Sequence, residues 1–200
     1  RLFDSLAKAE QPCILFLDEI DAIGAKRTNT SGDSGGAGRG KNSALTVLLR
    51  KVEAFQGVMI AATNRADVLD AALWRRFGMQ IKVDLPDPDS RWGILKRYLL
   101  PFIVPDSALD LLTDLTDGAS PALLRQVMEG VKRAIMLGPR LGQPSLSLPA
   151  TLESVIGENA PHPDYAPPLL WSEKKTALAE LAALDIAWPP QRADKPEDAP

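Results

Sequence analysis

Short apolar runs alternate with helical patterns over the first 85 residues. Residues 13–17 and 58–62 are continuous apolar runs, and residues 81–85 alternate between apolar and polar, which together predict three strands. Apolar residues also recur every three or four positions from 45 to 52, as on one face of a helix. Because strands separated by helices usually pair in parallel, the pattern predicts an α/β fold with helices on both faces of a parallel sheet.

Composition and capping residues add further elements to this region. The apolar residues at positions 2, 3 and 6 share one helical face and predict a helix before the first strand. Residues 28–40 are rich in Ser, Gly and Asn and contain almost no apolar residue, so we expect a loop there. The next helix is expected to begin at position 42 or 43, and Asp70 is the expected N-cap of a short helix, 71–76.

Only helical patterns follow Pro86. Asp87 and Ser120 each precede a Pro that would occupy the first helical position, so both are expected N-caps. Prolines become frequent beyond Gly138, with one amphipathic helix after Ser172 and a tail whose composition predicts disorder. The expected parts are an α/β core (1–86), a small helical subdomain (87–138) and a Pro-rich extension with one helix and a disordered tail (139–200).

Charge and composition narrow the classes of partner. The chain has 23 basic and 26 acidic residues and a net charge of −3, so no broad positive field for nucleic acid is indicated. Its longest apolar runs, about five residues, are far below the roughly 20 that a membrane-spanning helix needs. The single cysteine, Cys13, excludes a disulfide within the chain, and a reducing cytoplasm is the expected compartment.

Polar side chains follow the first two predicted strands. Asp18 and Glu19 come directly after residues 13–17, and Thr63 and Asn64 follow the second apolar run. Ligands of α/β proteins bind at the carboxyl ends of parallel strands, where one carboxylate can hold Mg²⁺ on a phosphate and the next can activate water. The alternative is structural, because acidic residues also favour the first turn of a helix and Asn favours turns.

Two longer segments carry a family resemblance. Residues 13–24, Cys-Ile-Leu-Phe-Leu-Asp-Glu-Ile-Asp-Ala-Ile-Gly, resemble the Walker B segment of the AAA+ ATPases. Residues 61–77, Ala-Ala-Thr-Asn-Arg-Ala-Asp-Val-Leu-Asp-Ala-Ala-Leu-Trp-Arg-Arg-Phe, resemble the second region of homology of the AAA subgroup. The resemblance runs from about Arg1 to about Leu137. It implies part of a parallel-sheet P-loop NTPase core followed by a small all-α lid at 87–138.

The resemblance implies roles for single residues. Asp18 would coordinate Mg²⁺, Glu19 would be the catalytic base, Asn64 would be sensor 1, and Arg75 and Arg76 would be arginine fingers that act on the ATP of a neighbouring subunit. A planar cation supplied in trans neutralises charge on the γ-phosphate in the transition state. Many relatives separate the two arginines by Pro-Gly, whereas here they are adjacent, and we slightly favour Arg75 as the finger.

Further positions resemble the family, and for some of them a functional and a purely structural interpretation are both open. Gly118-Ala119-Ser120 resembles a turn that packs near adenine and ribose in the family. Arg125 falls where some relatives carry a sensor 2 arginine, but it is equally interpreted as a solvated helix residue. The polar loop with Lys26, Arg27, Arg39 and Lys41 corresponds in position to the second pore loop of the ring, or is a plain linker. His162, the only histidine, is assigned no role.

The phosphate-binding motif of the family is absent from these 200 residues. No Gly-x-x-x-x-Gly-Lys-Ser/Thr occurs, and the only Gly-Lys, at 40–41, is followed by Asn. We expect the P-loop upstream of Arg1, its strand lying between the strands at 58–62 and 81–85. The 200 residues by themselves are expected neither to bind ATP tightly nor to fold cooperatively, and they are expected to be inactive as an ATPase. No His-Glu-x-x-His occurs either, so a membrane protease of the AAA type is not supported within these 200 residues.

The leading interpretation is a cytoplasmic, ring-forming AAA+ ATPase. It would form a homo-oligomer, a hexamer by resemblance, that binds ATP with Mg²⁺ and uses hydrolysis to remodel or unfold a polypeptide. Neither nucleic acid nor a membrane is indicated as a partner. Two alternatives are a non-catalytic AAA-like adaptor subunit and an Mg²⁺-dependent phosphohydrolase that uses only the acidic edge of the sheet.

Overall fold

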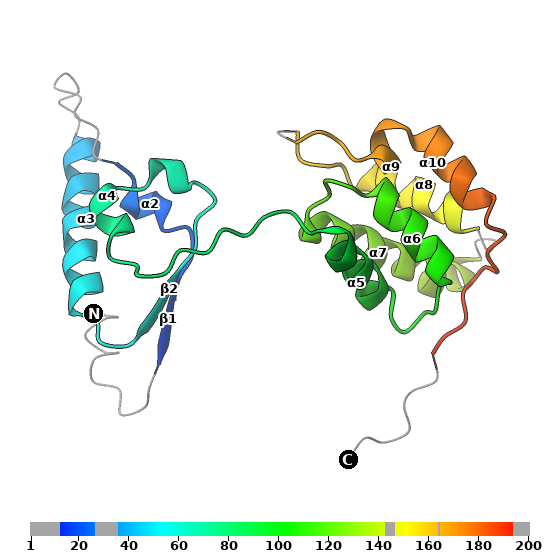
Figure 1. The fold of residues 1–200 in the computed structure, drawn as a ribbon, viewed down its shortest axis with the longest axis horizontal. Helices are drawn as coiled ribbons and strands as arrows, with labels where there is room; N and C mark the ends of the chain where they lie inside the picture. The colour runs from blue at the N-terminus through cyan, green and yellow to red at the C-terminus, as the bar shows by residue number, and fades with distance from the viewer. Residues whose placement is uncertain (1–12, 27–35, 143–146, 164, 194–200) are drawn as a thin grey trace, which may run out of the picture. The chain divides into compact units, whose positions relative to one another are not determined.

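The computed structural model describes residues 13–26, 36–142, 147–163 and 165–193, with side chains described from residue 42 onward in the second range. The chain divides into two compact units, an N-terminal unit (1–82) and a C-terminal unit (83–200), which are drawn in Figure 1 and described separately below. None of the helices described is long and apolar enough to cross a bilayer.

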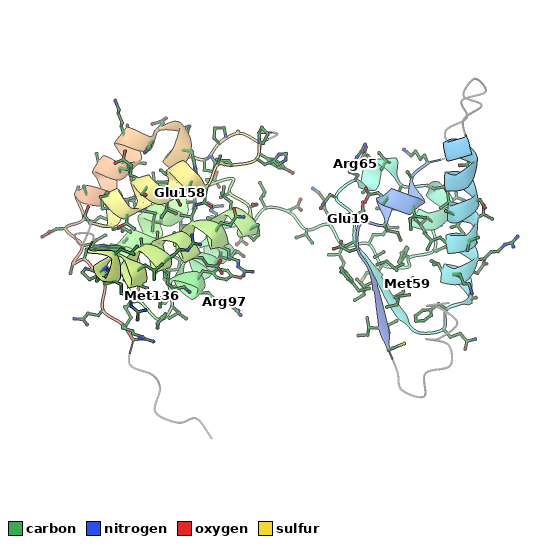
Figure 2. The ribbon with its side chains drawn as sticks, turned by 180° about the vertical axis from the view of Figure 1, so that it is seen from behind. Glu19, Met59, Arg65, Arg97, Met136 and Glu158 are labelled. Atoms are coloured by element: carbon green, nitrogen blue, oxygen red, sulfur yellow. The ribbon has the colours of Figure 1, made fainter. Side chains whose placement is uncertain are left out.

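The N-terminal unit is built on two parallel strands. β1 (Ile14–Leu17) and β2 (Val58–Ala61) pair in register, with Leu17 opposite Ala61, as the sequence predicts. The helix α3 (Gly36–Ala54) lies along one face of this sheet (Figure 1). Alternate strand residues point to that face, among them Leu15, which is 7% exposed, and Met59, which faces α3 in Figure 2.

Two short helices and one helical turn complete the N-terminal unit. They are α2 (Asp21–Gly24), the 3₁₀ turn η1 (Ala66–Val68) and α4 (Ala71–Trp74). Asp70 accepts a hydrogen bond from the backbone N–H of Ala72 at 2.8 Å, which confirms it as the N-cap of α4. The small core contains the apolar stripe of α3 and the ends of the other elements: Ile20, Leu45, Val52, Leu69 and Leu73 are its buried members.

Two predictions for this unit are wrong. Residues 81–85 form no strand, and the side chains of Ile81 and Val83 are 78% and 87% exposed. A strand needs a neighbour for its backbone hydrogen bonds, and none of the described segments pairs with this one. The helix expected from position 42 or 43 begins at Gly36 instead, nearly two turns earlier, because a helix can extend beyond its apolar stripe, so residues 36–40 of the predicted loop are helical. The helix predicted before the first strand lies outside the described residues.

The C-terminal unit consists of helices around one core. Its elements are α5 (Pro88–Leu99), α6 (Asp106–Leu115), α7 (Pro121–Leu137), η2 (Pro139–Leu141), α8 (Leu148–Glu158), α9 (Leu169–Ser172) and α10 (Lys174–Ala182). Asp87 caps α5 by accepting from the Ser90 N–H at 2.8 Å, and Ser120 caps α7 by accepting from the Leu123 N–H at 3.2 Å. Both expected N-caps are therefore confirmed.

The segment after residue 138 contains more helix than predicted. The expected helix is present as α10, but α8 and α9 precede it, so the prediction of one helix is wrong. Leu148, Leu152 and Val155 of α8 are buried in the same core as α5, α6 and α7. Their spacing is helical, and Pro149 occupies a position in the first turn where proline is tolerated. The helical subdomain and this segment therefore share one hydrophobic core.

A buried arginine ties the beginning of α5 to the end of α6. Arg91 is 5% exposed, and its guanidinium donates to the carbonyl oxygens of Thr113 at 3.2 Å and Pro86 at 2.9 Å. It also lies 2.9 Å from a carboxylate oxygen of Asp117. Because a guanidinium carries several donors in a fixed plane, one side chain satisfies these three acceptors and holds the turn that leads to Gly118.

Candidate functional site

The carboxyl ends of β1 and β2 bring the predicted acidic pair and Asn64 to one edge. The ladder continues past the strands, since the Ala62 N–H donates to the Leu17 carbonyl at 2.8 Å and the Ile20 N–H donates to the Ala62 carbonyl at 3.0 Å. Asp18, Glu19 and Asn64 are exposed there. The backbone between Leu17 and Ile20 therefore lies beside the turn that carries Asn64.

Glu19 has a left-handed backbone. Its φ is 49°, a conformation that residues other than glycine adopt at a cost of about 1–3 kcal/mol and that clusters at functional sites. The Glu19 N–H donates to the Asp18 carboxylate at 2.9 Å, so the bend between the two residues is held by the first carboxylate itself. The bend separates the directions of two adjacent acidic side chains. Figure 2 places Glu19 at the end of the sheet, near Arg65.

The acidic edge fits one type of metal site. Among the described residues, no three His, Cys, Asp or Glu side chains gather as a complete set of metal ligands. Mg²⁺ does not require such a set, because it keeps several waters and is commonly held by one or two carboxylates together with nucleotide phosphates. Exposed carboxylates at Asp18 and Glu19 fit that mode of binding, and Asp18 as the metal ligand stays a prediction of the family resemblance.

A side-chain hydrogen bond joins the two polar strand ends. The Thr63 hydroxyl donates to a carboxylate oxygen of Asp21 at 2.6 Å, and the same hydroxyl accepts from the Arg65 N–H at 3.0 Å. The chemistry of the Walker B resemblance does not require this contact, and the sequence analysis missed it. Its signal was present as a hydroxyl two residues beyond β2 and a carboxylate four residues beyond β1.

The two predicted finger arginines lie at the C-terminal end of α4. Arg76 forms an ion pair with Glu53 of α3 at 3.2 Å, while Arg75 has no ion-pair partner among the described residues. The packing of α4 is set by Gly24, because a Cβ on that glycine would collide with the Leu73 side chain. The structure records no contact between these arginines and the Asp18–Glu19 edge. It leaves them as exposed cations on the same unit.

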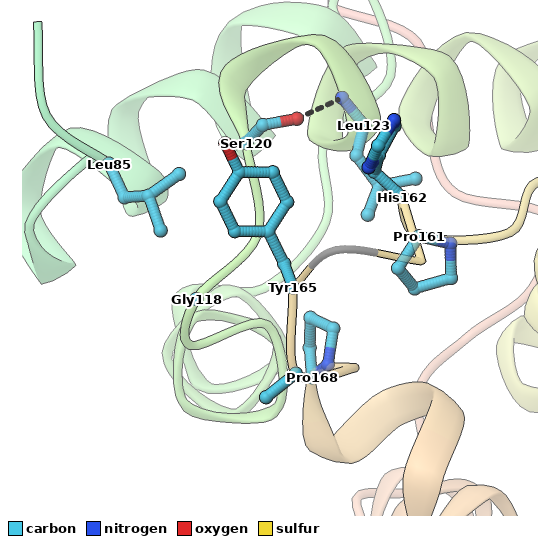
Figure 3. A pocket seen from close by; sticks show the side chains of 9 residues that line it. Leu85, Gly118, Ser120, Leu123, Pro161, His162, Tyr165 and Pro168 are labelled. Carbon is cyan, nitrogen blue, oxygen red and sulfur yellow. Dashed lines mark hydrogen bonds between the residues drawn. The ribbon is translucent and has the colours of Figure 1, made fainter. Parts of the chain in front are cut away.

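The predicted nucleotide-contacting turn of the C-terminal unit borders a small pocket of about 50 Å³ (Figure 3). Gly118 has a φ of 80°, and open space surrounds the position where a Cβ would be. Ala119 is 1% exposed, so its methyl group belongs to the core. The pocket is lined by three stretches of this unit: Leu85, then Gly118, Ser120 and Leu123, then Pro161, His162, Tyr165, Ala166 and Pro168.

An aromatic pair forms part of the pocket wall. The rings of His162 and Tyr165 meet edge to face with their centres 5.9 Å apart. Both belong to a Pro-rich stretch for which the sequence predicts no element and no role. Their proximity to Gly118 could not be read from the sequence, because it depends on how α8 packs.

Arg125 contacts one side chain of its own helix and one of α5. Its guanidinium lies 2.8 Å from a Glu129 carboxylate oxygen one turn later and 5.5 Å from the centre of the Tyr98 ring. The hydrogen bond with Glu129 raises the pKa of Arg125 above its ordinary value. Arg125 does not line the pocket at Gly118. This geometry matches the interpretation as a solvated helix residue, and sensor 2 stays a prediction.

The predicted pore-loop residues are only partly described. The Lys26 ammonium donates to the Asp67 carbonyl at 2.6 Å, which joins the end of α2 to η1. Arg27 lies outside the described residues, as do the side chains of Arg39 and Lys41. Both interpretations of this segment stay open.

Comparison with known proteins agrees with the family resemblance and the fold. Residues 1–85 match the family described as "ATPase family associated with various cellular activities (AAA)". The chain is 43% identical over 128 residues to the proteasome-activating nucleotidase of Pyrococcus furiosus, covering 61% of this chain and 32% of that protein. It is 38% identical over 148 residues to the chloroplastic ATP-dependent zinc metalloprotease FTSH 2 of Oryza sativa subsp. japonica, covering 70% and 21%.

Solved structures support the fold. The FIGL-1 AAA domain in complex with ADP superposes with a TM-score of 0.60 at 24% identity, covering 92% of this chain and 60% of that one. A second structure of the FIGL-1 AAA domain gives a TM-score of 0.58 at 25% identity, covering 92% and 59%. The chain spans about a third of the length of the nucleotidase that it matches.

A short parallel sheet with carboxylates at its edge, followed by a helical unit, matches the fold of an AAA domain, an α/β core with a helical lid. Residues 1–85 belong to the AAA family, and the chain carries part of an AAA+ ATPase module.

Proposed function

We propose that the protein containing this chain binds and hydrolyses ATP, with Mg²⁺, as a ring-forming AAA+ ATPase that remodels a polypeptide. The observation that carries the proposal is the placement of Asp18, Glu19 and Asn64 at one edge of the parallel sheet. Phosphoryl transfer asks a protein mainly for positioning and charge stabilisation, and these three polar groups supply it where α/β folds bind ligands.

Each residue of the edge has a distinct part in the proposed reaction. Asp18 would hold Mg²⁺ through its carboxylate, and the bound ion would supply charge neutralisation at the phosphates. Glu19, turned away by its left-handed backbone, accepts a proton from the attacking water. Asn64 lies on the neighbouring strand end, where an amide can orient that water or the γ-phosphate by hydrogen bonding.

Arg75 and Arg76 are proposed to act on the nucleotide of an adjacent subunit. Their exposure at the end of α4, away from any contact with the chain's own acidic edge, supports action in trans. Arg75 is the better candidate, because Arg76 is already paired with Glu53. A finger supplied by a neighbour requires a closed ring, and we propose a homo-hexamer in the cytoplasm.

We propose that Gly118 and the backbone of Ala119 contact the base and ribose of ATP. The pocket beside Gly118 supports this, since the rings of His162 and Tyr165 offer an apolar face to a flat base. Arg125 has the weaker case as sensor 2, because it would have to exchange Glu129 for a phosphate. The relatives, a proteasome-activating nucleotidase and an ATP-dependent zinc metalloprotease, support a polypeptide substrate.

The decisive experiment is Glu19→Gln in the complete ATPase, P-loop included. We expect phosphate release to fall by roughly a hundredfold or more, since general base catalysis contributes about 10²–10⁴. ATP affinity, measured with a fluorescent analogue, should change by less than about threefold. Glu180→Gln, an exposed carboxylate on α10, is the control and should leave both unchanged.

The same measurements separate the proposed function from its alternatives. Unchanged turnover in Glu19→Gln would remove the catalytic base and contradict the mechanism. ATP binding without turnover in the unmodified protein would favour an adaptor subunit. Hydrolysis of simple phosphate esters that needs neither ring assembly nor Arg75 would favour an Mg²⁺-dependent phosphohydrolase.

A further inference from the structure

A threonine hydroxyl connects the two turns that carry the candidate catalytic groups. Thr63 is half-buried; its Oγ1 donates to Asp21 Oδ1 at 2.6 Å and accepts from the Arg65 N–H at 3.0 Å. A hydroxyl has one proton to donate, so the bond to Asp21 commits it, and the bond from Arg65 uses a lone pair. The direction of both bonds is therefore fixed.

The Asp21 carboxylate is not used as a helix cap. Asp21 is the first residue of α2, where an acidic residue commonly bonds the backbone of its own helix. Here its recorded partner is the Thr63 hydroxyl, 42 positions away in the sequence. A hydrogen bond to a charged acceptor is shorter and stronger than one between neutral groups, in agreement with the 2.6 Å distance.

The bond lies one residue from Asn64 and two residues from Glu19 along the chain. Asn64 stands between Thr63 and Arg65, so both ends of its short turn are held by the same hydroxyl. Two residues before Asp21 is Glu19, and the Ile20 N–H between them bonds the Ala62 carbonyl at 3.0 Å. The segment with Glu19 and the segment with Asn64 are thus joined twice, once through backbone and once through the Thr63–Asp21 pair.

We propose that Thr63 and Asp21 are positioning residues that set Asn64 in place relative to Glu19. This inference rests on the proposed ATPase function. Without the Asp21 bond, the backbone link at Ile20 would still join the strands, but the Thr63 hydroxyl would no longer anchor the turn from Thr63 to Arg65 to the beginning of α2. Asn64 would then sample positions around the one that orients water, and misplacement of about 1 Å can cost roughly a hundredfold in rate.

The test replaces the hydroxyl without changing the shape of the side chain. In the complete ATPase, Thr63→Val should lower kcat by roughly 10- to 100-fold, while KM and ATP affinity change by less than about threefold. Thr63→Ser, which restores the donor and the acceptor, should recover most of kcat. The control is Thr46→Val, because the Thr46 hydroxyl is also half-buried but bonds only the Asn42 carbonyl within α3 at 2.9 Å.

Hydrogen exchange in the complete ATPase without nucleotide separates this inference from the proposed function. Hydrogen exchange of the Arg65 amide should accelerate at least about tenfold in Thr63→Val, while the Ile20 amide exchanges as before. Accelerated exchange in a protein that never hydrolyses ATP would support the link and contradict the function. An active Thr63→Val enzyme with unchanged kcat, or unchanged Arg65 exchange, would overturn the inference.

Discussion

Gly130→Ala tests whether the Pro-rich segment packs on the helical lid. Gly130 is buried within α7, facing Val155 of α8. A Cβ at this position would lie 2.6 Å from Val155 Cγ1 and 3.3 Å from Cγ2, closer than carbon atoms approach. Val155 is 5% exposed, and its branched side chain has essentially one rotamer in a helix, so it cannot turn aside.

Two opposing effects decide the sign of this change. Alanine favours an ordinary helix interior over glycine by about 1 kcal/mol. Overpacking a filled core costs about 1–3 kcal/mol, and here the obstacle is a stiff side chain. We therefore expect a net loss of about 1 kcal/mol in the free energy of unfolding of the C-terminal unit.

A second glycine in the same unit gives the matched control. Gly93 is an exposed residue inside α5, and nothing lies within 4 Å of the position where its Cβ would be. Gly93→Ala should therefore stabilise the unit by about 0.5–1 kcal/mol through helix propensity alone. The same chemical substitution is expected to have opposite signs at the two positions.

Urea unfolding followed by circular dichroism at 222 nm measures both effects. The urea concentration at the midpoint of unfolding should decrease in Gly130→Ala and increase in Gly93→Ala. The dependence of the unfolding free energy on urea concentration should stay unchanged in both. Val155→Ala should relieve the collision, giving a coupling energy of about 1 kcal/mol in the double mutant. If Gly130→Ala stabilised the unit as much as Gly93→Ala, α8 would not pack on α7 and the shared core would be refuted.

The remaining predictions concern charge. The hydroxyl and N–H of Ser90 donate hydrogen bonds to the Asp87 carboxylate and lower its pKa. The ionised carboxylate therefore stabilises the folded protein fully above its ordinary pKa of about 3.9, and this stabilisation is lost as the pH falls through the lower pKa of the folded state. Asp87→Asn should flatten this part of a thermal-melt pH profile; an unchanged profile would exclude Asp87 as its source. Arg75→Ala in the complete ATPase should lower kcat about a thousandfold, and Arg76→Ala far less. Mixing inactive Arg75→Ala and Glu19→Gln subunits should restore some turnover if the arginine acts in trans, and none if it acts within its own subunit.

The elements predicted correctly have causes that lie close together in the sequence. β1 and β2 are apolar runs bounded by polar residues, and their parallel pairing follows from the long helical connection between them. The caps at Asp87 and Ser120 depend on contacts within three residues. The acidic edge was predictable because parallel strands end at the same edge of a sheet, so the side chains that follow them lie close together.

The features that were missed depend on contacts between distant segments. α8 has a clear apolar stripe, but the frequent prolines around it kept this helix from being predicted. Only its packing against α7 shows that it belongs to the core. The Thr63–Asp21 bond and the approach of Tyr165 to Gly118 likewise join residues more than 40 positions apart. No pattern along the chain specifies such distances.

The wrongly predicted strand and the exposed face of the sheet both contain apolar residues that are suited to burial. Ile14 and Phe16 of β1 are 67% and 57% exposed, and they share a face with Val58 and Ile60 of β2. Such a face is normally covered by a second layer. Residues 81–85 alternate as a strand should, yet they form no strand, because a strand needs a neighbouring strand for its backbone hydrogen bonds. The P-loop strand that the family resemblance implies would lie between β2 and residues 81–85, and it would supply backbone partners to both.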